Sequence, residues 1–227
     1  MSEIVSYRVE ENIATLTIDD GKANAVSFQF IEQVNAALDR AEKDKAVTIL
    51  TGRPGKFSAG FDLSALSRGG DSATRLVRIG AQLCERLLGF PTPVIAACNG
   101  HSLALGALLL LAADYRIGTE GNYKIGTNEV AIGMPLPYFG VELARLRLSP
   151  LHFSRAVANA EIYNPQGAVE AGFLDVVVSE EELMETAVQS AQGLARLDMA
   201  AHYATKMRVR EKALSTINEA IEKEYGA

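Results

Sequence analysis

The apolar segment 102–113 constrains the fold more than any other part of this 227-residue chain. It contains no charged residue, and most of its residues are leucine or alanine. A segment of this composition has to be removed from water, yet it is well short of the roughly 20 residues that cross a bilayer. We therefore predict that it forms a buried helix rather than a membrane span.

The overall composition is that of a globular protein and argues against several classes of function. Hydrophobic residues make up 48% of the chain and charged residues 22%, so extensive disorder is not expected. The formal net charge is −6 and the sequence pI is about 5.2, whereas a nucleic-acid-binding protein needs basic surface. Residues 1–11 lack a signal-peptide pattern, so we expect a cytoplasmic protein.

The two cysteines indicate neither a disulfide framework nor a metal site. Cys84 and Cys98 do not form a CxxC pair, and no paired histidines accompany them. We predict two free, buried thiols.

Strands and helices alternate along the chain, which favours a layered α/β core. The break after the third strand is residues 52–55, and a loop with one helical turn is expected over residues 56–66. Ser27 is the expected cap of the first helix. Strands are predicted at 4–9, 13–18, 46–51, 94–97, 115–118, 123–125 and 174–178, and helices at 28–41, 72–88, 105–113, from 138, 180–196 and 200–224.

Two segments carry small residues where backbone N–H groups can remain unpaired. Residues 57–63 turn sharply after a strand, and free N–H donors at such a turn can bind an oxyanion; the alternative is an ordinary loop in which Asp62 caps a helical turn. Residues 98–106 lead into the apolar helix, so its N-terminus points into the interior and favours an anionic ligand oxygen. The alternative there is a core helix capped by Ser102.

A third segment, residues 127–135, contains a lone carboxylate among apolar residues and glycines. A surface position is the commoner place for a glutamate. If Val130, Ile132 and Met134 desolvate Glu129, its pKa rises and it becomes a better proton acceptor.

These segments, in this order, resemble the crotonase (enoyl-CoA hydratase/isomerase) superfamily. The resemblance is carried by SAGFDL, PVIAACNGHSLALGALLLLAADYRIG and YKIGTNEVAIGMPLP, and YNPQGAVEAGFLDVVV resembles the stretch before the family's C-terminal helices. It implies an α/β fold with a spiral of β-β-α repeats over residues 1–178, followed by a helical trimerisation region over residues 179–227. It also implies a homotrimer or a dimer of trimers, and an acyl-CoA thioester substrate that brings the coenzyme A, with no separate cofactor.

The resemblance assigns the catalytic groups residue by residue. The N–H groups of Ala59 and Leu105 are expected to bind the thioester oxygen, with Gly106 as the adjacent candidate, and Glu129 is expected to be the base. Leu108 stands where hydratases of the family carry a second glutamate. The chain therefore resembles the mitochondrial Δ3-Δ2-enoyl-CoA isomerases, in which one base moves a double bond from C3 to C2.

Other reactions of the superfamily stay open. A hydratase, hydrolase or decarboxylase would need a further polar group, such as His101 or Asn128, and a non-catalytic relative would bind acyl-CoA without turnover. The four basic residues of segment 206–212 either contact coenzyme A across a subunit boundary or form a solvated helix face.

The substrate is expected to contact two groups of residues. The phosphates of coenzyme A are expected at Lys22, Arg53 and Lys56, and Ala25, Ser58, Asp62 and Leu63 lie in the same motifs. The acyl chain is expected to contact Leu66, Leu105, Leu108, Met134 and Phe139.

Overall fold

The computed structural model describes residues 3–67 and 69–226. Its largest element is a six-stranded sheet with the order β1-β2-β3-β5-β7-β9. The β1–β2 pair is the predicted antiparallel hairpin, and all other neighbours in this sheet are parallel. The strands are β1 (Val5–Glu10), β2 (Ile13–Ile18), β3 (Val47–Thr51), β5 (Val94–Cys98), β7 (Tyr115–Thr119) and β9 (Val176–Val178).

A second, smaller sheet consists of three parallel strands in the order β4-β6-β8. They are β4 (Gly55–Ser58), β6 (Gly100–Leu103) and β8 (Ile125–Gly126). The sequence predicted a loop at β4 and an entry into the apolar helix at β6. Both strands were missed because they are short and begin with a glycine, which weakens the strand pattern. The glycines are needed there, since a side chain on Gly100 would collide with the backbone of Gly55.

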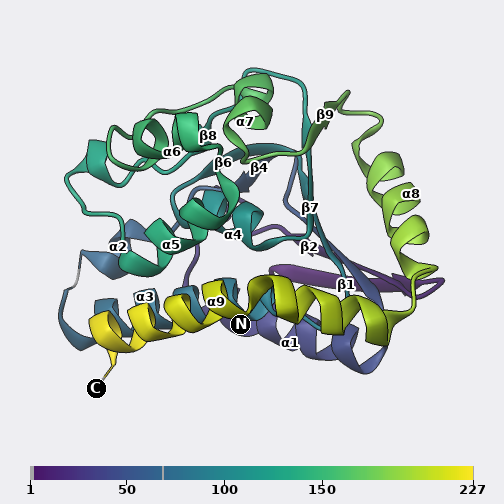
Figure 1. The fold of residues 1–227 in the computed structure, drawn as a ribbon. Coiled ribbons are helices and arrows are strands. Elements are labelled where there is room, and N and C mark those ends of the chain that lie inside the picture. The colour runs from purple at the N-terminus through teal and green to yellow at the C-terminus, as the bar shows by residue number, and fades with distance from the viewer. Residues whose placement is uncertain (1–2, 68, 227) are drawn as a thin grey trace.

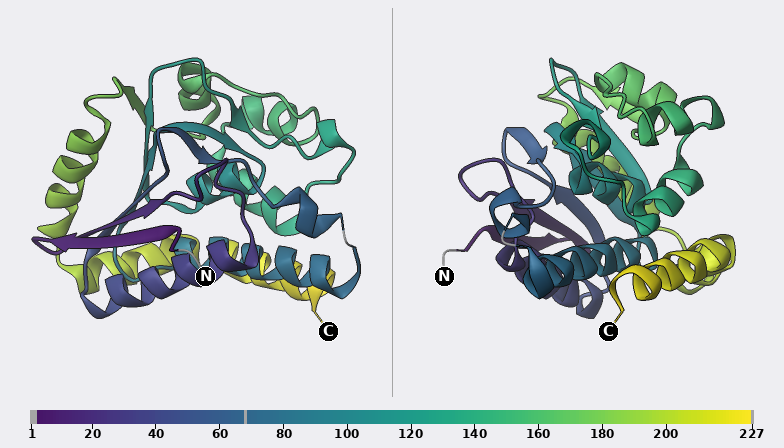
Figure 2. Two further views of the ribbon diagram at one scale, coloured as in Figure 1. Left: turned by 180° about the vertical axis from the view of Figure 1, so that it is seen from behind. Right: turned by 90° about the vertical axis from the view of Figure 1, so that its left-hand side faces the viewer.

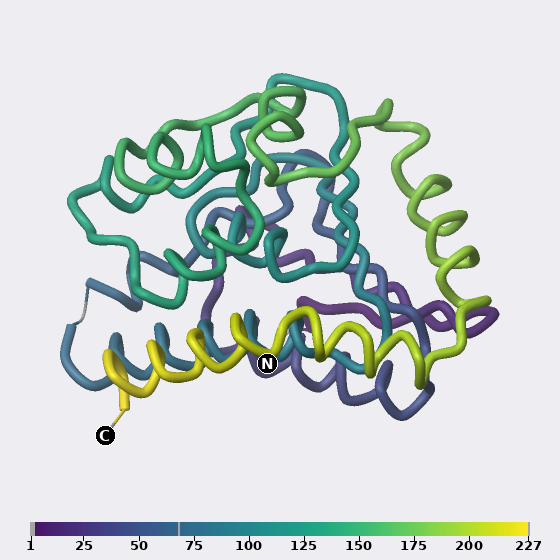
Figure 3. The backbone as a smooth tube through the Cα atoms, viewed as in Figure 1, coloured from purple at the N-terminus to yellow at the C-terminus, as the bar shows by residue number. Residues whose placement is uncertain are grey.

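The two sheets are connected by a repeating β-β-α unit, as the family resemblance predicted. A strand of the large sheet runs into a strand of the small sheet, and a helix then returns the chain to the next strand of the large sheet. The units β3-β4-α3 and β5-β6-α4 follow this scheme, and the tube in Figure 3 shows the resulting spiral. The carboxyl ends of β4, β6 and β8 consequently lie at one edge of the small sheet.

The helices pack on both faces of the large sheet (Figures 1 and 2). α1, α3 and α9 lie below it in Figure 1, and α8 covers its opposite face, contacting β2, β3, β5 and β7. No helix in the described part of the chain has the length and apolar character that a membrane crossing requires. The helices are α1 (Phe28–Lys43), α2 (Leu63–Leu66), α3 (Gly70–Leu88), α4 (Leu105–Ala112), η1 (Val130–Ile132), α5 (Tyr138–Arg147), α6 (Pro150–Val157), α7 (Pro165–Ala171), α8 (Leu183–Ala195) and α9 (Met199–Tyr225).

The helix α4 lies at the centre of the molecule, between α3 and α5 (Figure 1). All eight of its residues are buried, which confirms the buried helix predicted from the apolar segment. The helix has no side-chain cap, because Ser102 lies in β6 instead and Ala104 holds the N-cap position. By contrast, Ser27 caps α1 as predicted, and its Oγ accepts a hydrogen bond from the Phe30 N–H at 3.2 Å.

The C-terminal helix α9 is held to the core by buried cations. Lys206 Nζ lies 2.7 Å from Asp114 Oδ2, and Arg210 lies 2.9 Å from Asp114 Oδ1, just beyond the end of α4. Burial lowers the pKa of Lys206 to about 8, while Asp114 opposes this shift. Both side chains are buried, so neither is solvated nor available to a phosphate of coenzyme A, and the prediction for this segment is wrong at these two positions. Arg208 and Lys212 of the same segment are exposed.

We expect Asp114→Asn to destabilise the protein by about 3–5 kcal/mol, because it leaves two buried cations without a counter-charge. Urea unfolding at pH 7 measures the change in the free energy of unfolding. The control is Glu10→Gln, which removes the exposed ion pair with Arg8 and should cost less than about 1 kcal/mol. Equal losses in the two variants would contradict a structural role for the buried cluster.

Candidate active site

The three parallel strands of the small sheet bring three parts of the predicted site to one edge. Phe61 follows the end of β4, Leu105 follows the end of β6, and Glu129 follows the end of β8. Because parallel strands share the edge at which they end, these residues leave the sheet on the same side. The predicted catalytic segments therefore meet in the fold although more than 60 residues separate the first from the last.

The N-terminus of α4 presents unpaired donors in the interior. Ala104 has φ +50° and ψ −125°, a turn conformation that lets β6 enter the helix directly. The first helical hydrogen bond is from the Leu108 N–H to Ala104 O at 3.2 Å. Within the described residues, no acceptor faces the N–H groups of Leu105 and Gly106, and Leu105 is fully buried. Both residues thus have free N–H donors, as predicted for a site that binds an oxyanion.

The loop after β4 offers a different donor from the one predicted. The Ala59 N–H donates to Ala23 O at 3.0 Å, and the Gly60 N–H donates to Ser58 Oγ at 3.2 Å. In the described part of the chain the Phe61 N–H has no acceptor. The assignment of Ala59 as oxyanion donor therefore does not fit this structure, because its N–H is already bonded. Phe61, two residues later, is the donor that remains free.

Gly60 holds this loop against the start of α4. Its φ is +83°, and a Cβ at this position would lie 2.6 Å from the Ala104 Cβ and 3.2 Å from the Leu105 N. Only glycine tolerates both this backbone conformation and this close approach. The backbone before Phe61 and the backbone of Leu105 are consequently in direct contact, which brings the two free donors into one small region.

Glu129 is buried, with 8% of its surface exposed, and its Oε2 has no hydrogen-bond partner among the described residues. Burial raises the pKa of Glu129 to about 7. The expectation that Val130, Ile132 and Met134 bury it was wrong, because all three are exposed on the turn that follows. Their apolar character indicated burial, but all three emerge on the outside of the turn around η1, while Glu129 just before it is buried.

Two predicted substrate-binding residues have internal partners. Ser58 is buried, and its Oγ donates to Asn24 O at 2.8 Å, while a Cβ on Gly106 would lie 2.6 Å from Ser58 O. Ser58 and Gly106 thus hold β4 against α4. Asp62 is the N-cap of α2, as the alternative interpretation stated, and Leu63 is exposed beside it.

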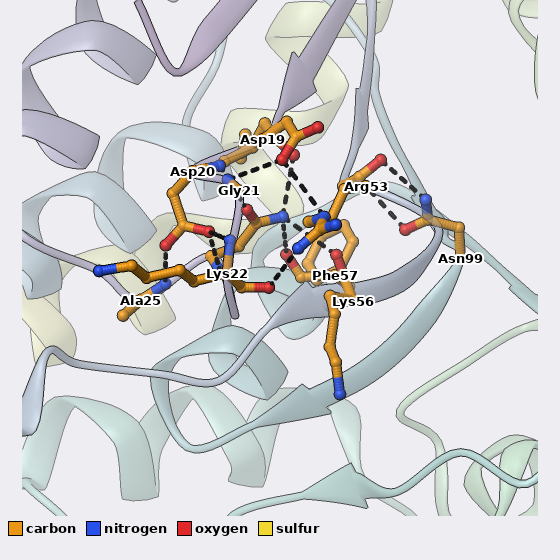
Figure 4. Close-up of polar contacts among 12 residues, drawn as sticks. Asp19, Asp20, Gly21, Lys22, Ala25, Arg53, Lys56, Phe57 and Asn99 are labelled. Atoms are coloured by element: carbon orange, nitrogen blue, oxygen red, sulfur yellow. Dashed lines mark hydrogen bonds and ion pairs between the residues drawn. The ribbon is translucent and has the colours of Figure 1, made fainter. Parts of the chain in front are cut away.

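Asn24 organises the predicted coenzyme A edge and was missed by sequence analysis; two residues that accept its hydrogen bonds, Lys56 and Phe57, are labelled in Figure 4. It is fully buried with φ +52°, and its Nδ2 donates to the carbonyls of Ile18, Lys56 and Phe57 at 2.9–3.2 Å. Asparagine tolerates this left-handed conformation better than most residues. An asparagine after a short polar turn was the available signal. Its role is to join the end of β2 to β4.

The basic residues at this edge differ in their availability. Arg53 lies 3.3 Å from Asp19 and donates to Lys22 O at 2.8 Å, so its guanidinium is already engaged. The ammonium groups of Lys22 and Lys56 make no ion pair among the described residues, and both side chains extend away from the loop in Figure 4. The backbone N–H of Ala25 donates to Asp20, which shapes the turn between them.

His101 makes structural contacts away from the carboxyl edge. Its Nδ1 accepts a hydrogen bond from the Lys124 N–H at 3.0 Å, and its ring packs edge-on against Tyr123. Burial, together with Lys56 and Lys124, lowers the pKa of His101. The imidazole is therefore neutral near pH 7, and neither of these contacts connects it to Glu129.

The predicted acyl-pocket residues divide into buried and exposed positions. Leu105, Leu108 and Phe139 are fully buried around α4, Leu66 is half-buried, and Met134 is exposed. Leu108 lies against α5, since its Cδ1 is 3.0 Å from where a Cβ on Gly140 would be. An aliphatic side chain, rather than a second carboxylate, occupies this interior position.

The raised pKa of Glu129 implies that its charge destabilises the fold. Glu129 is ionised above about pH 7 in the folded state but above about pH 4.5 when unfolded, so the cost grows between these pH values and is complete above pH 7. We expect Glu129→Gln to be about 2–3 kcal/mol more stable than the parent at pH 8, with the difference falling below about 1 kcal/mol at pH 4.5. Urea unfolding at both pH values tests this, with the exposed Glu181→Gln as control. A constant difference across this range would contradict a buried, ionised Glu129.

Comparison with known proteins assigns the family. The family model for enoyl-CoA hydratase/isomerase matches residues 8–226. A crystal structure of an enoyl-CoA hydratase/isomerase family protein from Pseudomonas syringae is 49% identical, with a TM-score of 0.97 over 98% of this chain and 96% of that chain. A probable enoyl-CoA hydratase of Bacillus subtilis is 30% identical over 81% of this chain and 72% of its own length. The human mitochondrial enoyl-CoA delta isomerase 1 is 29% identical over 90% of this chain and 70% of its own length. The chain therefore belongs to the enoyl-CoA hydratase/isomerase family, the crotonase superfamily to which its motifs pointed.

Proposed function

We propose that this protein is an enoyl-CoA isomerase that moves a double bond from C3 to C2 of an acyl-CoA thioester, with Glu129 as its single base. One observation carries the proposal. In the described part of the chain, Glu129 Oε2 is the one carboxylate oxygen that is buried without a partner. It lies beyond the same sheet edge from which Phe61 and Leu105 present their free N–H groups. A base and an oxyanion site at one edge suit proton removal beside a carbonyl.

The reaction needs one proton transfer in each direction. Glu129 accepts the C2 proton, and the thioester carbonyl becomes a dienolate whose negative charge lies on oxygen. The N–H groups of Phe61 and Leu105 donate to that oxygen, and one such donor is typically worth about 10²–10³ in rate. The same carboxyl group returns the proton to C4, which leaves the double bond between C2 and C3 and restores the base.

The environment of Glu129 suits this task. A base works best when its pKa lies near the operating pH, and burial raises the pKa of Glu129 to about 7. A dry pocket also strengthens the hydrogen bonds to the dienolate oxygen. Leu108 is a buried aliphatic residue at the position where hydratases of the family carry a second glutamate, and its side chain offers no partner to the water that a hydration reaction requires.

Hydration of a 2-enoyl-CoA is the second candidate, and one observation favours it. Asn128 Oδ1 is also buried without a partner among the described residues, beside Glu129 in sequence. An amide oxygen could hold a water molecule for attack at C3. Relatives of this chain include a protein described as a probable hydratase as well as an isomerase.

The binding of coenzyme A and the assembly state are part of the same proposal. Lys22 and Lys56 are the basic residues at the β2–β4 edge that we assign to its phosphates. We further propose a trimer or a dimer of trimers, in line with the family, and the cytoplasmic location stays a prediction.

We expect purified protein to convert 3-hexenoyl-CoA to 2-hexenoyl-CoA, followed by the ultraviolet absorbance of the conjugated thioester. Glu129→Gln should lower this rate by about 10²–10⁴-fold while leaving the binding of hexanoyl-CoA within a few-fold, because the amide cannot accept the C2 proton. Glu181→Gln is the matched control. Addition of water to 2-hexenoyl-CoA is measured in parallel, and hydration without isomerisation would replace this proposal by the second candidate.

The pH dependence of catalysis should report Glu129. We expect kcat/KM for isomerisation to fall about tenfold per pH unit below pH 7 and to level off above it, because only the carboxylate form accepts a proton. His101→Gln should keep the same inflection. An inflection that moves with His101, or its absence near pH 7, would assign the base to another group.

A further inference from the structure

Two buried glycines lie inside the helices that flank α4, Gly80 in α3 and Gly140 in α5. Glycine is a poor helix former, and neither residue has a positive φ that would require it. The backbone conformation therefore does not explain these glycines. Their missing side chains explain them, since both face side chains of α4 across a close contact.

The contact at Gly80 involves the two residues that present the free donors. A Cβ at position 80 would lie 2.6 Å and 2.7 Å from Cε1 and Cζ of the Phe61 ring, and 3.0 Å from Cδ2 of Leu105. At Gly140 the nearest atom would be Leu108 Cδ1, at 3.0 Å. In α8, by contrast, a Cβ on the helical Gly193 would meet nothing within 4 Å. The close fit is thus a property of the helices that surround α4.

Neither donor residue has much freedom to move aside. Leu105 is fully buried at the first position of α4. The backbone on either side of Phe61 is bonded, since the Val26 N–H donates to Gly60 O at 2.8 Å and the Asp62 N–H donates to Val26 O at 3.1 Å. The ring is a rigid group on two torsion angles. The ring is half-buried and packs against the core, so we infer that an added methyl group displaces the ring together with the loop that carries it.

We propose that Gly80 is a positioning residue of the thioester site: its missing side chain seats the Phe61 ring and the Leu105 side chain on α3, and this fixes the two N–H donors relative to each other. The inference rests on the proposed oxyanion site at Phe61 and Leu105. A donor must lie within about 2.7–3.1 Å of the developing oxyanion. Small displacements at such a site reduce the rate strongly, by about 10²-fold for 1 Å.

The test compares Gly80→Ala with the matched control Gly193→Ala, which adds the same methyl group to a helix interior without a contact. The first readout is the 4-dimethylaminocinnamoyl thioester of coenzyme A, whose absorption moves to longer wavelength when hydrogen bonds polarise its carbonyl. The second readout is isomerisation of 3-hexenoyl-CoA. We expect Gly80→Ala to lose most of the red shift and to lower kcat at least tenfold with KM within about threefold. Gly193→Ala should match the parent in both.

A double-mutant cycle separates positioning from general packing. Phe61→Leu removes the two ring atoms nearest to position 80, so Gly80→Ala should change the red shift and kcat less than twofold in the Phe61→Leu background. A Gly80→Ala protein that keeps the parent's red shift and kcat within twofold would overturn the proposal. An equal effect of Gly80→Ala in the parent and in the Phe61→Leu background would also overturn it. The same holds if circular dichroism shows the Gly80→Ala protein to be unfolded at 25 °C. Because the red shift requires no turnover, a parent that shifts the probe but does not isomerise would contradict the proposed reaction alone.

Discussion

The burial of α4 is the constraint on which the rest of this structure depends. A helix with no charged side chain has to be enclosed on every side, and here the small sheet and the helices α3 and α5 pack against it. Enclosure leaves its end groups without water, so each end needs another partner. At the C-terminal end, Arg147 donates to the carbonyls of Leu111 and Ala113. At the N-terminal end no acceptor among residues 3–67 and 69–226 bonds the N–H groups of Leu105 and Gly106, which leaves that end able to bind a ligand.

The two ends of α4 therefore serve different purposes. The end near Asp114 is neutralised within the protein by a cluster of buried cations from α5 and α9. Such clusters are costly to assemble and costlier to break, since removing one partner leaves charges in a medium that solvates them poorly. The opposite end, next to Ala104, has N–H groups without acceptors in the described part of the chain, and Glu129 Oε2 likewise has no partner there. Stability is thus concentrated at one end of the helix and chemical reactivity at the other.

The sequence allowed the prediction of elements long enough to show a clear hydrophobic pattern. The hairpin, the long helices and the apolar α4 fall in this class, and the assignment of Glu129 and Leu105 to the site came from the motifs around them. Ala59 was assigned in place of Phe61, because the choice depends on tertiary hydrogen bonds to Ala23 that no local pattern encodes. Lys206 and Arg210 were interpreted as contacting coenzyme A or as solvated for the same reason: their counter-charge, Asp114, lies about 90 residues away in sequence.

The dependence on non-local partners also explains the errors in burial. Segment 130–134 is apolar, but a 3₁₀ turn ending at Gly133 in the left-handed conformation directs it outward. Asn24 is polar, yet it is fully buried, because three backbone carbonyls converge on its amide. A hydropathy pattern reflects how often a residue type is buried on average, whereas the burial of these side chains depends on a few specific partners.

The arrangement of the site has a consequence for how such a chain can change in length. Phe61, Leu105 and Glu129 each lie two or three residues beyond the end of a strand of the small sheet, and each strand belongs to a different turn of the spiral. Inserting or deleting one residue within such a short spacer would move the group away from the strand end that positions it, whereas adding a turn to a connecting helix would leave all three groups in place. Chains with this architecture can therefore vary in the length of their surface helices while three short spacers stay unchanged, and three of the four motifs that carry the family resemblance contain these spacers.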